Sequence, residues 1–187
     1  MSGSEQNGQN DSALNILNLQ LANMSTENQY VTFKIGEEEY GVDIMLVQEI
    51  IRYKKPTKIY NANPMIKGII NFRGKVIPII DMHKKFDLGE QNYDEYTVVI
   101  VIEVESKTMG MIVDRVSDIM SFKKEEIQIV DQEFAEDIKT EHLKGMAKSR
   151  DRIIMLLEPN RVLSFRELNQ ISKAYGEDEA NLTKEQI

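Results

Sequence analysis

The sequence predicts a mainly β fold made of two similar halves, each a small barrel. Short runs in which apolar and polar residues alternate recur along the 187-residue chain, separated by turn residues. Two stretches of the first half also recur, in the same order, in the second half. Many short strands with frequent turns favour closed barrels over open sheets, because closure removes exposed strand edges.

The first two predicted strands form a hairpin at residues 30–44. Apolar residues alternate with polar ones from Val31, the sequence Gly-Glu-Glu-Glu at 36–39 turns the chain, and alternation resumes at Tyr40. A short helix is expected next, beginning at an N-cap on Asp43 and ending at Pro56. The residues of its apolar face have helical spacing: Ile44, Val47, Ile50 and Ile51.

A second hairpin is predicted at residues 66–80, with its turn at Arg73 and Gly74. Pro78 lies inside the returning strand, which indicates an edge strand or a bulge, because proline cannot donate a ladder hydrogen bond. The acidic, turn-rich residues 87–95 are expected to be a connector.

The second half begins with residues 97–104, an almost unbroken β-branched run typical of a strand buried on both faces. Residues 109–113 return from it. A last strand pair is expected beyond Leu143, with its turn at Arg150 and Asp151. A C-terminal helix is expected after it, through Leu163, Phe165 and Leu168.

The internal repeat supports the two-part organisation. Residues 41–51 (GVDIMLVQEII) align without gaps on residues 110–120 (GMIVDRVSDIM), and residues 67–81 align in the same way on residues 144–158, at offsets of 69 and 77 residues. Two matches in register predict halves that each contain a hairpin, a crossover helix and a second hairpin. The join between such halves is a natural groove for a partner helix.

The predicted body covers residues 29–170, with a first half at about 29–90 and a second half at about 91–160 whose ends intertwine. Residues 1–28 are expected to be a flexible extension, and residues 171–187 a loose acidic tail. Leucines at helical spacing favour a helix at residues 12–24 within the extension. Whether this helix docks on the body, docks on a partner or frays is left open by the sequence.

Composition excludes several classes of protein. The net charge of −8 disfavours nucleic-acid binding, which depends on basic residues that neutralise phosphates. The absence of cysteine excludes disulfides and thiolate chemistry. No window approaches the roughly 18 consecutive apolar residues that a membrane span needs. Residues 1–28 contain no Lys or Arg, so a signal peptide is not expected and the predicted location is the cytoplasm.

No enzyme template matches the sequence. The phosphate-binding loop, the dinucleotide-binding glycine pattern and the nucleophile elbow are all missing. The two histidines, His83 and His142, are far apart and are interpreted as structural rather than as metal ligands. Asp81 and Asp114 are candidates for acid–base catalysis only if they converge in space, and Asp81 shares with Glu158 a structural place at a strand end. The sequence therefore predicts a non-catalytic adaptor without a cofactor or metal.

Four segments carry a resemblance to a known family. They are EEEYGVDIMLVQEI (37–50), IKGIINFRGKVIPIIDM (66–82), YTVVIVIE (96–103) and GMIVDRVSDIM (110–120). Through them the chain resembles the CheW family of bacterial chemotaxis coupling proteins over about residues 29–168. The most specific part is residues 71–74, where Phe72 replaces the leucine that is usual in the family.

The resemblance implies two small five-stranded SH3-like barrels in tandem, with short helices and a C-terminal helix. It implies a scaffold that couples the cytoplasmic tips of methyl-accepting chemoreceptors to the regulatory domain of the histidine kinase CheA, with no enzyme activity and no cofactor. The protein is then expected to be cytoplasmic and recruited to membrane-bound receptor arrays. The alternatives are an adaptor in a non-motility receptor–kinase pathway, or a barrel hydrolase or small-molecule binder.

Arg73 is the leading candidate for partner binding, because an Arg at a tight turn projects a planar group with several donors. The alternative is a turn-anchoring role such as Arg150 could have. Glu49 is expected to be exposed, and Val47 to lie in the core or in the groove. The residues expected at partner interfaces, including a second groove wall from the matching positions of the repeat, are Val47, Glu49, Gly68, Asn71, Phe72, Arg73, Gly74, Val116, Asp118 and Ile119.

Overall fold

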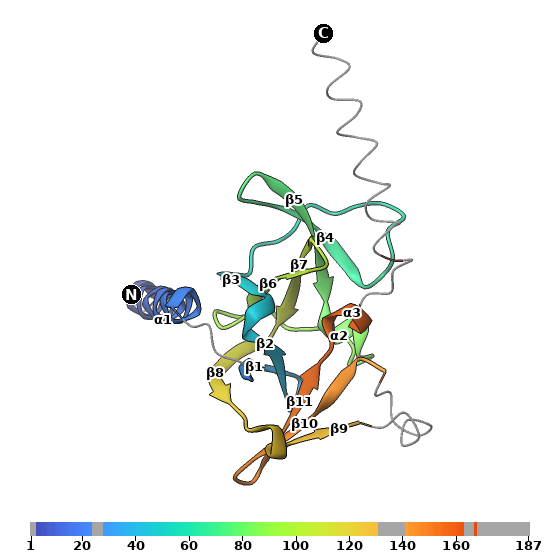
Figure 1. The fold of residues 1–187 in the computed structure, drawn as a ribbon. Helices are drawn as coiled ribbons and strands as arrows, with labels where there is room; N and C mark the ends of the chain where they lie inside the picture. Colours follow the sequence, from blue (N-terminus) through green and yellow to red (C-terminus); the bar gives the residue numbers. More distant parts are fainter. Residues whose placement is uncertain (1–2, 24–27, 131–140, 163–166, 168–187) are drawn as a thin grey trace.

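The computed structural model describes residues 3–23, 28–130, 141–162 and 167. The elements in chain order are α1 (Gly3–Asn23), β1 (Gln29–Ile35), β2 (Glu38–Asp43), the 3-10 helix η1 (Ile44–Leu46), β3 (Val47–Arg52), β4 (Ile66–Phe72), β5 (Lys75–Asp81), α2 (Met82–Lys85), β6 (Val98–Val104), β7 (Lys107–Val113), β8 (Arg115–Ser121), the 3-10 helix η2 (Lys124–Glu126), β9 (Ile127–Ile129), β10 (Leu143–Ser149), β11 (Arg152–Leu157) and α3 (Pro159–Val162). The mainly β fold is confirmed (Figure 1). The continuation of the C-terminal helix through Leu163, Phe165 and Leu168 lies outside the described residues.

The strands form two sheets of matching order. One runs β8-β1-β2-β11-β10-β9 and the other β3-β6-β7-β5-β4. Each contains one parallel pair, in which Gly41 lies opposite Leu156 in the first sheet and Gly110 opposite Ile79 in the second. The offset of 69 residues relates Gly41 to Gly110, and the offset of 77 residues relates Ile79 to Leu156. The repeat in the sequence is therefore also a repeat of structure. The first sheet takes its strands from residues 29–43 and 115–157 and the second from residues 47–113, so each sheet contains strands of both predicted halves.

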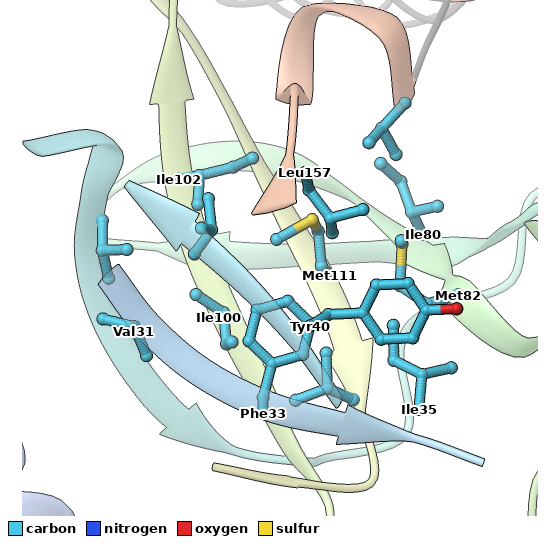
Figure 2. Close-up of a cluster of buried hydrophobic side chains, with 14 of the residues drawn as sticks. Val31, Phe33, Ile35, Tyr40, Ile80, Met82, Ile100, Ile102, Met111 and Leu157 are labelled. Atoms are coloured by element: carbon cyan, nitrogen blue, oxygen red, sulfur yellow. The ribbon is translucent and has the colours of Figure 1, made fainter. Parts of the chain in front are cut away.

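One hydrophobic core joins the two sheets. Figure 2 shows Phe33 and Tyr40 of one sheet facing Ile80 and Met111 of the other, and all four are at least nine-tenths buried. The alternation of apolar residues in β1 and β2 directs these side chains inward. Because burying a large apolar side chain is worth about 1.5–3 kcal/mol, this shared cluster fixes the sheets to one another.

The helix predicted after Asp43 is wrong. Only η1 is helical, capped by the Asp43 side chain, and the chain then enters β3. The register of β3 against β6 shifts between Val47 and Glu49, so the buried residues Val47 and Ile50 are three positions apart. An irregularity of this kind inserts one residue into the strand alternation and imitates helical spacing.

The edge position predicted from Pro78 is also wrong. β5 lies between β4 and β7, and Pro78 is paired with Ile69 of β4. The parallel ladder with β7 begins only at Ile79, so the missing N–H of Pro78 falls outside that ladder. A register shift does lie nearby in β4, between Ile66 and Gly68. The connector at residues 87–95 and the buried strand β6 are confirmed.

Candidate functional site

The turn between β4 and β5 holds Arg73 at a rigid tip. Arg73 and Gly74 both have positive φ, +49° and +80°, as the favoured two-residue hairpin turns require. The Asn71 side-chain oxygen accepts a hydrogen bond from the Gly74 backbone N–H at 3.0 Å. Asn71 and Gly74 therefore shape the turn that presents Arg73.

The Arg73 side chain reaches across to β3. Its Nη2 donates to Glu49 Oε2 at 2.6 Å, while 69% of the Arg73 side chain and 28% of the Glu49 side chain remain exposed. The Arg73 guanidinium carbon also lies 5.2 Å from the centre of the Phe72 ring. The Phe72 ring thus supports the guanidinium through a cation–π contact.

An open groove of about 830 Å³ begins at this ion pair. Its floor is β3, one wall is the tip of β4, and the other wall is α1, seen beside β3 in Figure 1. Four of the predicted interface residues lie around it, namely Glu49, Asn71, Phe72 and Arg73. The tertiary fold therefore brings a charged tip, an aromatic ring and an edge strand together.

Gly68 has a packing role in the same strand. A Cβ on Gly68 would lie 2.3 Å from the backbone oxygen of Thr57, which bridges β4 at Ile69. Its repeat equivalent, Gly145, is crossed in the same way by the backbone of Gln128 in β9. Both glycines let a second segment of backbone approach closely.

The remaining predicted residues lie apart from this groove. Val47 is 9% exposed and belongs to the core. Val116 and Ile119 of β8 are partly buried against the same core cluster, and the Asp118 side chain is bonded to the Ile119 N–H at 2.8 Å. β8 is the edge strand of the other sheet, so these residues do not line the groove beside Arg73.

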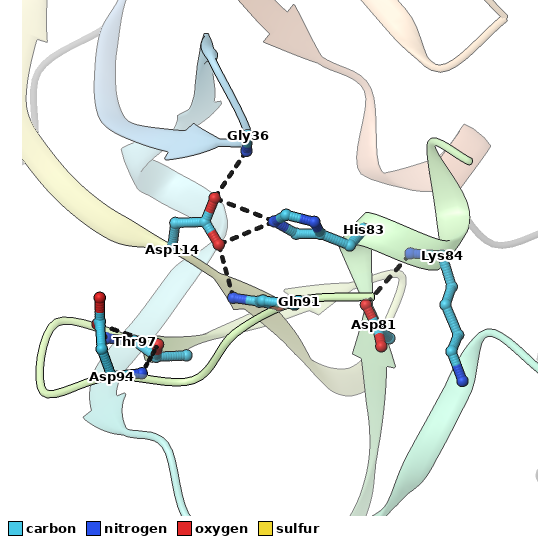
Figure 3. Close-up of polar contacts among 8 residues, drawn as sticks. All are labelled: Gly36, Asp81, His83, Lys84, Gln91, Asp94, Thr97 and Asp114. Carbon is cyan, nitrogen blue, oxygen red and sulfur yellow. Dashed lines mark hydrogen bonds and ion pairs between the residues drawn. The ribbon is translucent and has the colours of Figure 1, made fainter. Parts of the chain in front are cut away.

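The Asp114 carboxylate is a structural hub (Figure 3). It accepts hydrogen bonds from the Gly36 backbone N–H at 2.7 Å, from His83 Nε2 at 2.8 Å and from Gln91 Nε2 at 2.7 Å. These donors come from the β1–β2 turn, α2 and the 87–95 connector, so one carboxylate ties three segments together. Asp81 instead caps α2 by accepting the Lys84 N–H, which explains both carboxylates without catalysis.

The second histidine is also accounted for by the fold. His142 is 8% exposed, and its Nδ1 lies 2.7 Å from the backbone oxygen of Arg161. Among the described residues, no three His, Cys, Asp or Glu side chains are grouped so that they could hold a metal ion. The contacts of both histidines are therefore structural.

Two stacked tyrosines cover the outer face of the five-stranded sheet. The rings of Tyr53 and Tyr93 lie 4.2 Å apart at 7°, and Lys67 Nζ is 5.0 Å from the centre of the Tyr93 ring. Burial raises the pKa of both phenols above 10.0; the neighbouring Tyr93 adds to the rise at Tyr53, and Asp81 adds to it at Tyr93. Burial, followed by the charge of Glu38, raises the pKa of Tyr40.

The sequence left open whether the helix expected at residues 12–24 docks on the body; α1, which begins earlier at Gly3, docks on β3 and forms a wall of the groove. Asn18 Nδ2 donates to the Ile50 backbone oxygen and Asn18 Oδ1 accepts from the Ile50 N–H, each at 3.0 Å. Asp11 forms an ion pair with Arg52. The leucine spacing indicated a helix, but nothing in its composition distinguished an amide that binds a strand from the other amides around it.

Comparison with known proteins gives the family of this chain. The model of the CheW-like domain matches residues 29–167. The chain belongs to the CheW family. It is 40% identical over 148 residues to the chemotaxis protein CheW of Klebsiella aerogenes, covering 79% of this chain and 89% of that protein. It is 33% identical over 148 residues to the CheW of Treponema pallidum, covering 77% and 86%.

A solved CheW structure shares the fold. The scaffolding protein TtCheW from Thermoanaerobacter tengcongensis superposes with a TM-score of 0.69 at 30% identity, covering 77% of this chain and 92% of that one. The CheW family consists of scaffold adaptors of chemotaxis that are not enzymes, and this chain is one of them. Membership argues against the hydrolase alternative. In the described parts of the chain, no helix has the length and apolar character to cross a membrane.

Proposed function

We propose that this member of the CheW family couples the cytoplasmic tips of methyl-accepting chemoreceptors to the regulatory domain of the histidine kinase CheA, and that it is recruited from the cytoplasm to membrane-bound receptor arrays. A scaffold that binds two partners raises their effective concentration and fixes their orientation. Receptor signals then pass as shifts between preferred arrangements of the complex. No step of this mechanism needs a catalytic group.

The observation that carries the proposal is the geometry of Arg73. Its side chain is 69% exposed although it binds Glu49 and lies against Phe72. A tight turn, an aromatic ring and a carboxylate thus hold a multi-donor group in one orientation at the mouth of the groove. Preorganised Arg and aromatic side chains are the residue types that dominate protein interfaces.

The test compares Arg73→Ala with wild type in co-sedimentation with CheA and a receptor cytoplasmic fragment, followed by a kinase-activation assay. The matched control is Arg150→Ala, at the repeat-equivalent hairpin tip, where φ is also positive at +54°. We expect weakened assembly and activation for Arg73→Ala alone. An exposed ion pair contributes only about 0–1 kcal/mol, so the variant remains folded.

A charge-exchange variant separates a partner contact from an internal one. Arg73→Glu with Glu49→Arg preserves an ion pair within the chain but reverses the charges that a partner meets. If the Arg73 pair served only to stiffen the turn, the exchanged protein would assemble as wild type does. We expect it to remain as defective as Arg73→Ala.

Normal kinase activation by folded Arg73→Ala would show that Arg73 is not part of the partner interface. If wild-type protein associates with neither CheA nor the receptor fragment, coupling in chemotaxis is refuted. The adaptor of a non-motility receptor–kinase pathway then becomes the better hypothesis.

A further inference from the structure

α1 is a helix that needs the body of the protein to form. Its 21 residues include five Asn and two Gly, residue types that disfavour helix, and no basic residue in its last turn complements the helix dipole. Helices of such composition are marginal in water and gain their stability from packing. The docking contacts of α1 therefore decide whether it is helical at all.

Those contacts cover the edge of the five-stranded sheet. β3 is an edge strand, and the Asn18 amide both donates to and accepts from the Ile50 backbone at 3.0 Å, as a neighbouring strand would. Leu14 and Leu21 pack against the main core cluster. The Asp11–Arg52 ion pair fixes the other end.

The opposite face of α1 presents large apolar side chains to solvent. Ile16 is 58% exposed and Leu19 is 64% exposed. Segments that move come from the least stable parts of a structure, and α1 combines a marginal helix composition with a small polar clamp.

We propose that α1 is a built-in cover of the β3 edge at the groove beside Arg73, and that a receptor helix displaces α1 when it binds. This inference rests on the proposed function and adds a regulation to it. α1 forms one side of the groove and covers the β3 edge, while the Arg73 tip on the other side stays exposed. A partner can therefore make its first contact at Arg73 and then replace α1 along β3.

The contacts that α1 makes also indicate which kind of receptor helix could replace it on β3. An acid meets Arg52, an aliphatic residue three positions later meets the core, and an amide four positions beyond it reaches the Ile50 backbone. A receptor helix that carries groups of this kind at this spacing would satisfy the same strand edge. Displacement then costs the protein no buried unpaired backbone group at Ile50.

A helix that competes with the receptor and a helix that only supports the groove predict opposite changes in receptor affinity when the helix is loosened. If α1 leaves the β3 edge uncovered only a fraction of the time, the apparent dissociation constant of the receptor exceeds the intrinsic one by the inverse of that fraction. Loosening α1 should therefore tighten receptor binding, whereas loosening a supporting helix should weaken it. Asn18→Ala removes both bonds to Ile50 and should tighten binding by up to about tenfold.

The experiment uses the full-length chain. Because it has no cysteine, Asp11→Cys with Arg52→Cys can be bridged by a short bis-maleimide, which locks α1 in place. The control is the same double variant blocked with N-ethylmaleimide. Binding of a receptor cytoplasmic fragment is measured for these proteins, for Asn18→Ala and for Leu19→Ala, whose side chain points to solvent. Hydrogen exchange at the Ile50 amide reports α1 docking without any partner.

We expect the bridged protein to bind at least about tenfold more weakly than its blocked control, Asn18→Ala to bind more tightly, and Leu19→Ala to match wild type. The Ile50 amide should exchange faster in Asn18→Ala. Equal binding by bridged and blocked protein overturns the displacement of α1 and leaves the coupling function standing. Absence of receptor binding in every variant, Asn18→Ala included, overturns both.

Discussion

The close packing of the parallel pair β5–β7 around Gly110 offers a quantitative test of the fold. A Cβ added to Gly110 would lie 2.5 Å from Ile79 Cδ1 and 2.6 Å from Val99 Cγ1. Ile79 and Val99 are fully or almost fully buried. Val99 is β-branched, so its methyl groups cannot swing aside without leaving the favoured rotamer.

Gly41 is the matched control, since the repeat places it at the equivalent position of the other sheet. Its added Cβ would meet Leu156 Cδ2 at 3.1 Å, the far end of a flexible side chain that can yield by a few tenths of an ångström. Overpacking of a tight core costs about 1–3 kcal/mol, and we assign the upper part of that range to Gly110→Ala. For Gly41→Ala we expect less than about 1 kcal/mol.

The assay is thermal and urea unfolding of both variants, followed by circular dichroism. For a chain of this size, about 2–3 kcal/mol lowers the melting temperature by roughly 4–12 °C. Val99→Ala in the Gly110→Ala background should recover about 1 kcal/mol beyond additivity, because it removes a clashing methyl group. Equal destabilisation of the Gly110 and Gly41 variants, or no coupling to Val99, would refute this account of the parallel pairs.

Three further predictions concern the hub, the tyrosines and the groove. Asp114→Ala leaves three donors without their acceptor and should lower the free energy of unfolding by about 2–4 kcal/mol in urea titration; a loss below about 0.5 kcal/mol would contradict the hub. Because the pKa values of Tyr53 and Tyr93 are raised, the folded protein keeps protons that the unfolded chain loses, so the stabilisation is complete below pH 10 and declines as pH rises through and above 10. The urea midpoint should therefore fall above pH 10, and it should fall less in the double variant Tyr53→Phe with Tyr93→Phe. An identical fall in the double variant would exclude the tyrosines as its cause. Glu49→Gln should change the free energy of unfolding in urea by less than about 1 kcal/mol, but it should let the Arg73 side chain adopt more orientations. Nuclear magnetic resonance of the Arg73 guanidinium can detect this change, and an unchanged guanidinium spectrum would contradict the pairing.

The turn residues and the periodicity of the strands were readable in the sequence for physical reasons. The Arg73–Gly74 turn has the short, glycine-containing form that hairpins need, and β6 has the continuous β-branched run of a doubly buried strand. Both features depend on residues close together along the chain. Arg73 could be selected as a candidate because its exposure follows from its place at a tip.

The candidate site itself depended on contacts between distant residues. Glu49 meets Arg73 across 24 positions, Asn18 meets Ile50 across 32, and Asp114 meets Gly36 across 78. No local pattern encodes which carboxylate reaches which donor. The sequence supplied the right residue types on exposed positions, and the fold chose the partners.

The sequence by itself determined a duplicated, mainly β adaptor with a hairpin tip that presents Arg73. The tertiary structure alone decided that residues 47–52 form the edge strand β3 rather than a helix, because a register shift against β6 disguises the strand period and gives the apolar residues helical spacing. It also decided that α1 covers that strand. Strand edges offer backbone groups with no preference for side-chain sequence, so what covers them is set by the arrangement of the whole chain in space.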